Sequence, residues 1–103
     1  MTRQKYDVVI EAAHYSSDGN IAFIRAYERK GFAFSDLVLL DRKTLLERLQ
    51  NGKHFVTGKR KHLLGGAFEV EKTVKRLMHN GKEIVTTGGQ NQGHDLLEDV
   101  PIL

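Results

Sequence analysis

Hydrophobic and polar residues alternate in the first third of the chain, and this pattern predicts a β-hairpin. Residues 6–15 (YDVVIEAAHY) are rich in β-branched and aromatic residues, with apolar residues at alternate positions, as in a strand. Residues 16–19 (SSDG) predict a tight turn, because Asp18 can bond its own backbone and Gly19 accepts a positive φ. Residues 21–29 (IAFIRAYER) predict the returning strand. Since its apolar residues lie on both faces, we expect both faces to be covered.

The next segment predicts a connection and a short third strand. Phe32 and Phe34 lie in the connection 30–35 (KGFAFS), where two aromatic residues are unusual. We expect them to plug one end of the hydrophobic core. Residues 36–40 (DLVLL) predict the strand.

The clearest helix in the sequence begins after Asp41. The Asp41 side chain can cap the free amides of the first turn, and three leucines between residues 45 and 49 form an apolar stripe. Asn51 and Gly52 supply a left-handed stop. A helix of about ten residues is too short to be stable alone, so we expect it to pack on the sheet.

The second half of the chain predicts three more strands. Residues 53–57 (KHFVT) predict the fourth strand, and a basic turn at 58–62 (GKRKH) follows. Residues 68–79 are ambiguous, because their apolar positions fit both a strand and a helix. Asn80-Gly81 favours a strand, since this dipeptide is typical of a two-residue hairpin turn, and residues 82–87 (KEIVTT) predict the partner strand.

The order of these elements predicts a β-rich α+β fold with one short helix between the third and fourth strands. OB-fold barrels have this order, and small SH3-like barrels or open curved sheets are compatible with it. We therefore expect a small half-open barrel or curved sheet, OB-like or SH3-like. At 103 residues the chain has room for one domain. We place this domain at residues 1–87, followed at residues 88–103 by a flexible Gly/Gln/Asn spacer and an acidic-aliphatic segment.

Charge is sorted along the chain. Residues 1–52 carry a net charge of +1, residues 53–82 carry +6 and residues 83–103 carry −4, within a total of +3. A basic middle segment favours a polyanion or an acidic protein surface as partner. Alternatively, these lysines and arginines solvate strand edges and prevent edge-to-edge pairing.

The basic segment gives our first functional hypothesis, a non-enzymatic domain whose basic face contacts nucleic acid. Its centre is expected at Lys59, Arg60 and Lys61. Cationic side chains neutralise phosphates and release counterions, and aromatic rings stack on bases. The candidates for stacking are Phe55, Tyr27, Phe23 and Tyr15. The predicted nucleic-acid-binding residues are Lys53, Phe55, Lys59, Arg60, Lys61, Lys72, Lys75 and Arg76.

The acidic end gives the second hypothesis, a protein-interaction or homo-oligomerising module. Residues 95–103 (DLLEDVPIL) mix acids with large aliphatic side chains. They could dock in the groove of a partner, or pair with the basic middle segment of their own or another chain. Packing as an edge strand of the same domain is the alternative. The predicted partner-binding residues are Leu96, Leu97, Val100 and Ile102.

No catalytic constellation is readable in the sequence, and we rank an enzyme last. The stretch from Gly52 to Arg60 departs from a phosphate-binding loop, because five residues separate its glycines and no Ser or Thr follows Lys59. Residues 14–18 bring histidine, serine and aspartate together, but the predicted turn explains them. The five histidines form no ligand motif, and the chain has no cysteine. We therefore predict no catalytic residue, no metal site and no cofactor.

The expected location is the cytoplasm. No apolar run approaches the roughly 18 residues that cross a bilayer, so we predict no membrane partner. Residues 1–5 (MTRQK) lead directly into the first predicted strand without a signal-peptide pattern. The absence of cysteine is compatible with a reducing compartment.

Overall fold

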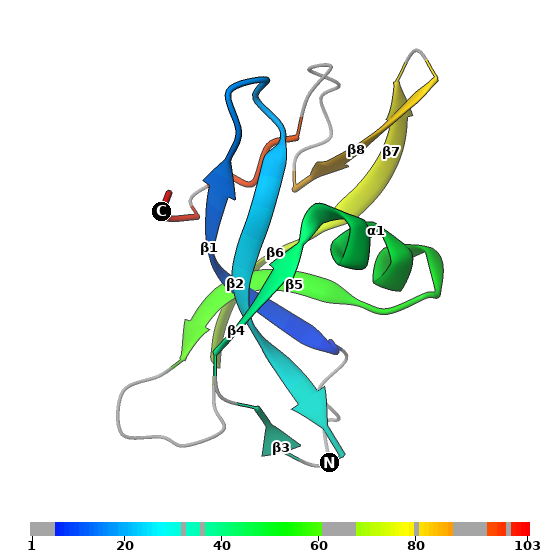
Figure 1. Cartoon of the computed structure of the whole chain (residues 1–103). Helices are drawn as coiled ribbons and strands as arrows, with labels where there is room; N and C mark the ends of the chain where they lie inside the picture. Colours follow the sequence, from blue (N-terminus) through cyan, green and yellow to red (C-terminus); the bar gives the residue numbers. More distant parts are fainter. Residues whose placement is uncertain are drawn as a thin grey trace.

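The structure is a computed structural model, and it describes residues 6–31, 33–35, 37–60, 68–79, 81–87, 95–98 and 100–103. Within these ranges the chain forms eight strands and one helix (Figure 1). The strands are β1 (Val8–Tyr15), β2 (Ile21–Lys30), β3 (Ala33–Phe34), β4 (Val38–Asp41), β5 (Phe55–Arg60), β6 (Phe68–Thr73), β7 (Lys75–His79) and β8 (Lys82–Thr86). The helix α1 (Arg42–Gln50) lies between β4 and β5. The prediction of a β-rich α+β fold is therefore confirmed.

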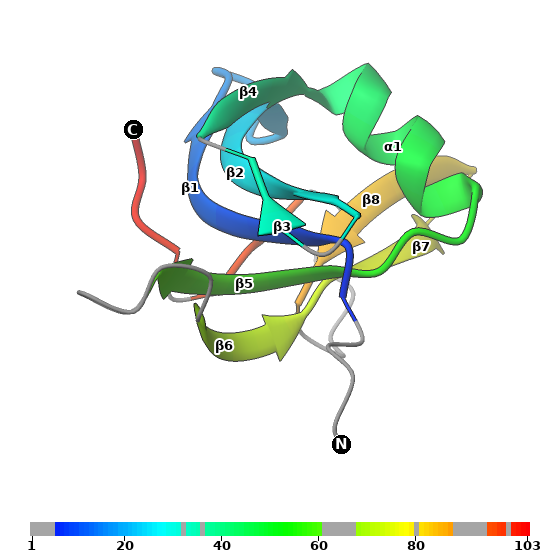
Figure 2. The ribbon, with the colours of Figure 1, turned by 90° about the horizontal axis from the view of Figure 1, so that it is seen from below.

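The strands form a mixed sheet and a separate hairpin. The sheet has the order β3-β2-β1-β5-β6, with β4 also paired to β2, while β7 pairs with β8. β1 is antiparallel to β2 but parallel to β5, because the crossover through α1 returns the chain to the same end of the sheet. Figure 2 shows the curvature of the sheet, with α1 on the side of β7 and β8. Among the described residues these pairings do not close into a barrel, and neither an OB-like nor an SH3-like barrel is confirmed.

The first hairpin forms as predicted. β1 and β2 pair along their lengths, and Gly19 takes a φ of +88° in the turn between them. The Asp18 carboxylate accepts a hydrogen bond from the N–H of Asn20 at 3.0 Å, which closes the turn. Neighbouring residues of the returning strand β2 enter different hydrophobic clusters, Ala26 the main core and Tyr27 a second cluster. The expectation that both faces are covered is confirmed.

The helix also forms as predicted. The Asp41 carboxylate caps its first turn by accepting the N–H of Thr44 at 2.8 Å, and this hydrogen bond lowers the pKa of Asp41 below its usual value. Gly52 takes a φ of +83° just after the last turn. Leu45 is fully buried against the sheet. This packing stabilises a helix that is too short to be stable by itself.

Two strand assignments made from the sequence are wrong. Phe34, which the sequence places in a connection, belongs to β3 and pairs with Arg29 of β2. The helix therefore follows the fourth strand instead of the third. Residues 58–60, which the sequence places in a turn, belong to β5 and pair with β6. Gly58 permits this close pairing, because the carbonyl oxygen of Glu69 lies where a Cβ atom would begin.

The second hairpin forms around Gly81 as predicted, but residues 68–79, predicted as a single strand, form two strands in different sheets. This segment is extended and divides into β6 and β7 at Val74. β7 and β8 are antiparallel over their whole length. Gly81 takes a φ of +80° in the turn between them, whereas Asn80 lies outside the described residues.

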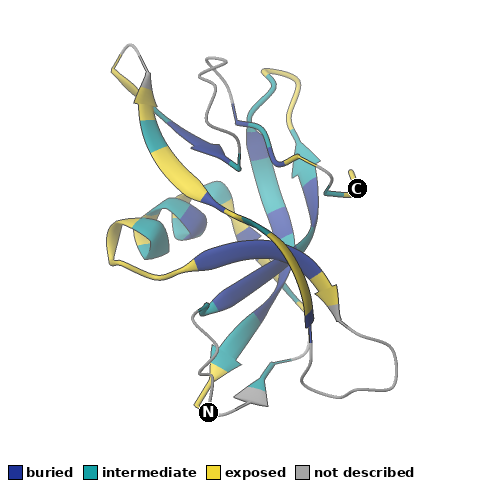
Figure 3. Ribbon diagram, turned by 180° about the vertical axis from the view of Figure 1, so that it is seen from behind, coloured by how far each residue is buried: buried dark blue, intermediate teal, exposed yellow. Residues whose placement is uncertain are grey.

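Two hydrophobic clusters stabilise the fold on either side of the sheet. The main core involves the sheet, α1 and the β7–β8 hairpin, and Phe55 is its largest fully buried side chain. The second cluster contains Tyr27 and Phe68, with Tyr6 and Phe34 packed against it. Figure 3 shows that buried stretches follow β1 and β5, which contribute to both clusters. Phe34 thus packs as expected, while Phe32 lies outside the described residues.

The described part of the C-terminal segment packs on the body of the fold. Leu97 is buried in the main core, and Leu96 donates its N–H to the carbonyl of Val85 at 2.9 Å. Leu103 donates its N–H to the carbonyl of Ala13 at 2.8 Å. Residues 95–98 therefore share a core with the segment that the sequence assigns to the globular domain.

Asp95 is the centre of this attachment. Its side chain is 0 % exposed and accepts the N–H of Ile21 at 2.9 Å and that of Val85 at 2.8 Å. The Nε of Arg42 donates to it at 2.7 Å. A buried carboxylate needs such partners, since burial of an unpaired charge costs several kcal/mol. Because its donors come from β2, β8 and α1, Asp95 connects three elements to the C-terminal segment.

Candidate functional site

The predicted nucleic-acid-binding residues are spread along β5 and its surroundings. Lys53 precedes β5, whereas Lys59 and Arg60 lie at its far end, about 20 Å away at the rise of a strand. Lys59 is paired with Glu69 at 3.8 Å. The side chain of Arg60 and all of Lys61 lie outside the described residues. Lys59 is thus the one member of the predicted centre whose side chain the structure describes, and a neighbouring carboxylate offsets its charge.

The structure overturns the prediction that Phe55 contacts nucleic acid. Phe55 is 0 % exposed in the main core, so its ring is not accessible to a base. Tyr27 is also buried, in the second cluster. Tyr15 and Phe23 are half-buried, and the Phe23 ring stacks on His14 with centroids 4.9 Å apart. Coverage of both faces of β5 explains the error, because Phe55 and the next residue, Val56, are both buried, in different clusters.

Three of the predicted cations line one groove at the start of β5, which we call the basic groove. Lys53 comes from the loop after α1, and Lys75 and Arg76 come from the first residues of β7. The groove has a volume of about 390 Å³. The half-buried Leu49 contributes apolar surface to it, and none of the described residues that line it is a carboxylate.

Backbone hydrogen bonds fix the two segments that form the basic groove. The N–H of Val74 donates to the carbonyl of Phe55 at 2.9 Å, which places the β6–β7 junction against the start of β5. The N–H of Lys53 donates to the carbonyl of Arg48 at 3.0 Å, at the end of α1. The N–H of the next residue, His54, donates to the carboxylate of Asp7, just before β1, at 2.8 Å. The backbone at the groove is therefore fixed, while the Lys53 side chain is exposed to solvent.

The three cations of the basic groove differ in their ion pairs. Arg76 is paired with Glu83 at 2.9 Å. Hydrogen bonds from Gln50 and Arg76 lower the pKa of Glu83, so that this carboxylate is charged at neutral pH. Among the residues that the structure describes, neither Lys53 nor Lys75 has an ion-pair partner. Lys53 and Lys75 are therefore the charges that the fold leaves uncompensated in the groove.

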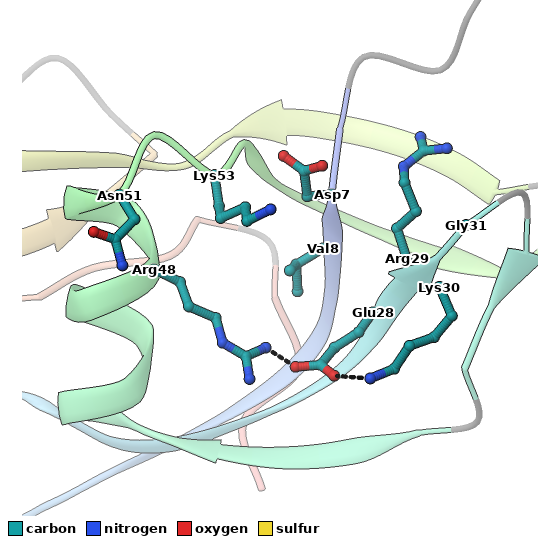
Figure 4. Close-up of a pocket in the computed structure, with 9 residues that line it drawn as sticks. All are labelled: Asp7, Val8, Glu28, Arg29, Lys30, Gly31, Arg48, Asn51 and Lys53. Carbon is teal, nitrogen blue, oxygen red and sulfur yellow. Dashed lines mark ion pairs between the residues drawn. The ribbon is translucent and has the colours of Figure 1, made fainter.

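A second cavity adjoins the basic groove and shares Lys53 with it (Figure 4). It has a volume of about 400 Å³ and lies between β1, the end of β2 and the end of α1. The Glu28 carboxylate is paired there with Arg48 and with Lys30, the latter at 3.6 Å. Asp7 is the other carboxylate of the lining, against four cations in total. The second cavity therefore extends the positive charge of the basic groove.

Sequence analysis missed the cations Arg29, Lys30 and Arg48 of the second cavity. The first 52 residues have nearly balanced charge, so no charge run marks these three. They meet Lys53 because β5 pairs with β1 in parallel, which brings the loop after α1 to the end of β2. No local pattern in the sequence encodes this proximity.

The remaining predicted residues contact the rest of the chain. Lys72 is paired with Glu98 at 3.4 Å, so the basic middle segment and the acidic end meet within one molecule at this position. Of the predicted partner-binding residues, Leu97 is buried, and Leu96 and Val100 are half-buried. Ile102 is 75 % exposed. Leu97 therefore packs within its own domain, which was the alternative to docking on a partner.

The histidine, serine and aspartate of residues 14–18 are arranged as a turn. The Ser16 hydroxyl donates to the Asp18 carboxylate, and this hydrogen bond is the main cause of the lowered pKa of Asp18. The His14 ring instead stacks on Phe23. Within the described ranges, no group of three or more His, Asp or Glu side chains could bind a metal ion.

Comparisons with known proteins identify no relative. The chain matches no protein family, no curated protein and no solved structure. The part of the chain that the structure describes contains no helix that is long and apolar enough to cross a membrane. The basic groove is therefore the feature on which a function can be proposed.

Proposed function

We propose that the protein is a non-enzymatic binding domain whose basic groove binds the phosphate backbone of nucleic acid. The observation that carries this proposal is the convergence of Lys53, Lys75 and Arg76 on a groove without a lining carboxylate. Like charges brought together repel one another, and a bound polyanion removes that repulsion. Lys53 and Lys75 are the main contacts, because the ion pair with Glu83 offsets the charge of Arg76.

Phosphate binding in this groove has a defined dependence on salt. Each neutralised phosphate releases condensed counterions, so log affinity falls by about 0.7–0.9 per unit of log salt concentration for each phosphate. Three cations therefore predict a slope of roughly −2 to −3. The apolar surface of Leu49 adds contact area that does not depend on salt.

Replacing Lys53 and Lys75 together by alanine tests the proposal. We expect binding of labelled oligonucleotides at low salt to weaken by about tenfold or more, and the salt slope to become shallower by about 1.5 to 2. Both side chains are exposed, so the fold should be unaffected. Fluorescence anisotropy with single- and double-stranded oligonucleotides at two salt concentrations measures both quantities.

A matched variant controls for net charge. Lys43→Ala combined with Lys59→Ala also removes two positive charges, from the start of α1 and the far end of β5. We expect this variant to bind nearly as the unmodified protein does. Equal weakening in the two double variants would show that overall charge, and not the basic groove, governs binding. Failure of the unmodified protein to bind any oligonucleotide at low salt would show that the proposal is wrong.

The second candidate is a protein-interaction or homo-oligomerising module, in which the basic middle segment meets an acidic tail or partner. A specific observation favours it. β4 is an edge strand that pairs only with β2 among the described residues. Leu37, just before β4, is 40 % exposed, and Leu39, within it, is 64 % exposed. Exposed apolar edge strands are sites where a second chain can add a strand.

A further inference from the structure

Two aromatic rings and one guanidinium group form a surface beside the second cavity. The rings of Tyr6 and Phe34 are half-buried, with centroids 5.8 Å apart. Both pack on Phe68, at 6.5 Å and 4.8 Å respectively. The guanidinium carbon of Arg29 lies 5.2 Å from the centroid of the Phe34 ring. We call Tyr6, Phe34 and Arg29 the aromatic platform.

The aromatic platform is organised before any ligand binds. Arg29 donates from Nε and Nη2 to the carbonyl oxygen of Tyr6, at 3.0 Å and 2.7 Å, which fixes the guanidinium group beside the rings. Burial raises the pKa of the Tyr6 phenol more than the charge of Arg29 lowers it, so this ring is neutral at neutral pH. Aromatic rings and arginine planes are the groups on which proteins stack unpaired bases.

The second cavity shares one residue with the basic groove and one with the aromatic platform. Lys53 lines both the groove and the cavity, while Arg29 lines the cavity and belongs to the platform. In Figure 4 the Arg29 side chain leaves β2 on the opposite side from those of Glu28 and Lys30. A ligand that contacts both features must therefore pass around the end of the sheet.

We infer that the nucleic acid is single-stranded, with its phosphates on Lys53 and Lys75 and its bases stacked on the aromatic platform. This inference rests on the proposed function and specifies the class of nucleic acid. The bases of a duplex stack on one another, so their faces are not accessible to Phe34 or Tyr6. Duplex DNA is also stiff, with a persistence length of about 150 base pairs, and does not bend around the end of so small a sheet. A single strand is flexible and exposes its base faces.

Three probes of equal length separate stacking from charge. They are an oligothymidine of about 12 nucleotides, a strand of the same length with an abasic site at every position, and a duplex. Oligothymidine and the abasic strand present the same phosphodiester charge, so only the former can stack. We expect the unmodified protein to bind oligothymidine at least about fivefold more tightly than either other probe, as stacking of a single base implies.

Tyrosine fluorescence gives a second readout from the unmodified protein. The chain has three tyrosines and no tryptophan, so tyrosine dominates its intrinsic emission. A base stacked on Tyr6 quenches part of that emission. We expect saturable quenching with oligothymidine and none with the abasic strand at the same occupancy.

A pair of variants assigns the stacking to the aromatic platform. Phe34→Leu keeps an apolar side chain against Phe68 but removes the ring, and we expect it to abolish the preference for oligothymidine over the abasic strand. Phe23→Leu is the matched control, because Phe23 is another half-buried ring but stacks on His14. It should keep the full preference. Circular dichroism establishes whether both variants fold. If Phe34→Leu does not fold, the comparison of the three probes with the unmodified protein decides whether bases stack.

The outcomes distinguish this inference from the proposed function. Equal binding of oligothymidine and the abasic strand, without quenching, overturns the inference and leaves phosphate binding intact. Tighter binding of the duplex, or the same loss of preference in Phe23→Leu as in Phe34→Leu, overturns it as well. Absence of binding to all three probes at low salt overturns the proposed function itself.

Discussion

Residues with local roles were predicted correctly, and Asp95 illustrates a residue whose role is not local. The capping contact of Asp41 and the positive φ of Gly19 and Gly81 depend on neighbours within three residues. Asp95 instead accepts hydrogen bonds from Ile21 and Val85, which are 74 and 10 residues away. Its sequence context of acids and leucines indicates an exposed tail, and only the fold reveals a buried carboxylate.

The substitution Asp95→Asn should lower the free energy of unfolding by about 3 kcal/mol, the usual cost of breaking a buried ion pair. An amide offers one acceptor oxygen to the donors of Ile21, Val85 and Arg42, and it leaves the Arg42 charge without its partner. Urea denaturation followed by circular dichroism measures the loss. Glu98→Gln, an exposed change in the same segment, should cost less than about 1 kcal/mol. Similar small losses for both variants would contradict the role assigned to Asp95.

At the candidate site, burial divides the residues that the sequence assigned to a nucleic-acid-binding face. Lys53 and Phe55 are two positions apart, and the sequence assigned both to the nucleic-acid-binding face. Phe55 begins β5 and is enclosed in the main core, whereas Lys53 is in the preceding loop and is exposed. Charge marked Lys53, Lys75 and Arg76 in the sequence. Which of them meet in space depended on contacts between β7 and the loop after α1.

At the scale of elements, the hairpins and the helix were predictable because hydrophobic periodicity and turn residues are local. The length of β5 was not predictable in this way. A run of glycine and basic residues at 58–60 indicates a turn, yet these residues pair with β6. Tertiary pairing overrode local preference, since each hydrogen bond between the strands satisfies a backbone group that would otherwise need water.

The substitution Gly58→Ala should destabilise the protein by about 1–3 kcal/mol, the cost of forcing atoms into a packed position. An added Cβ atom would overlap the carbonyl oxygen of Glu69, which is backbone and can move only if β6 shifts. Thermal unfolding and urea denaturation measure the change. Lys59→Ala, at the next position of β5, should cost no more than about 0.5 kcal/mol. A Gly58→Ala variant as stable as Lys59→Ala would contradict the close β5–β6 approach.

At the scale of the whole molecule, the charge that is segregated along the sequence is partly paired in space among the described residues. Lys59 is offset within β5–β6 by Glu69, and Lys72 is offset by Glu98 of the acidic segment. The sequence therefore indicated a broad basic face, whereas the fold confines uncompensated charge in the basic groove to Lys53 and Lys75. The first half of the chain adds cations to the second cavity. The sequence did not mark them, because acidic residues nearly balance the charge of that half.

Solution mass tests the second candidate function at this scale. A homo-oligomerising module should show, by light scattering, a mass above the 11.7 kDa of one chain that increases with concentration. If β4 is the interface, Leu39→Lys should return the mass to that of a monomer, because it places a charge on the exposed edge. Met78→Lys changes another exposed apolar residue, outside both β4 and the C-terminal segment, and should leave the mass unaltered. A monomeric mass at every concentration would exclude the homo-oligomerising form of this candidate.

The sequence by itself determined the β-rich α+β class, both hairpins, the helix with its cap, and the excess of cations in the middle segment. These features follow from periodicity, turn chemistry and charge, which act over a few residues. The tertiary structure decided the parallel pairing of β1 with β5, the burial of Asp95 and Phe55, and the position of Arg29 beside Phe34. Each of these depends on contacts between distant segments, which form only when the whole chain packs around its two hydrophobic clusters.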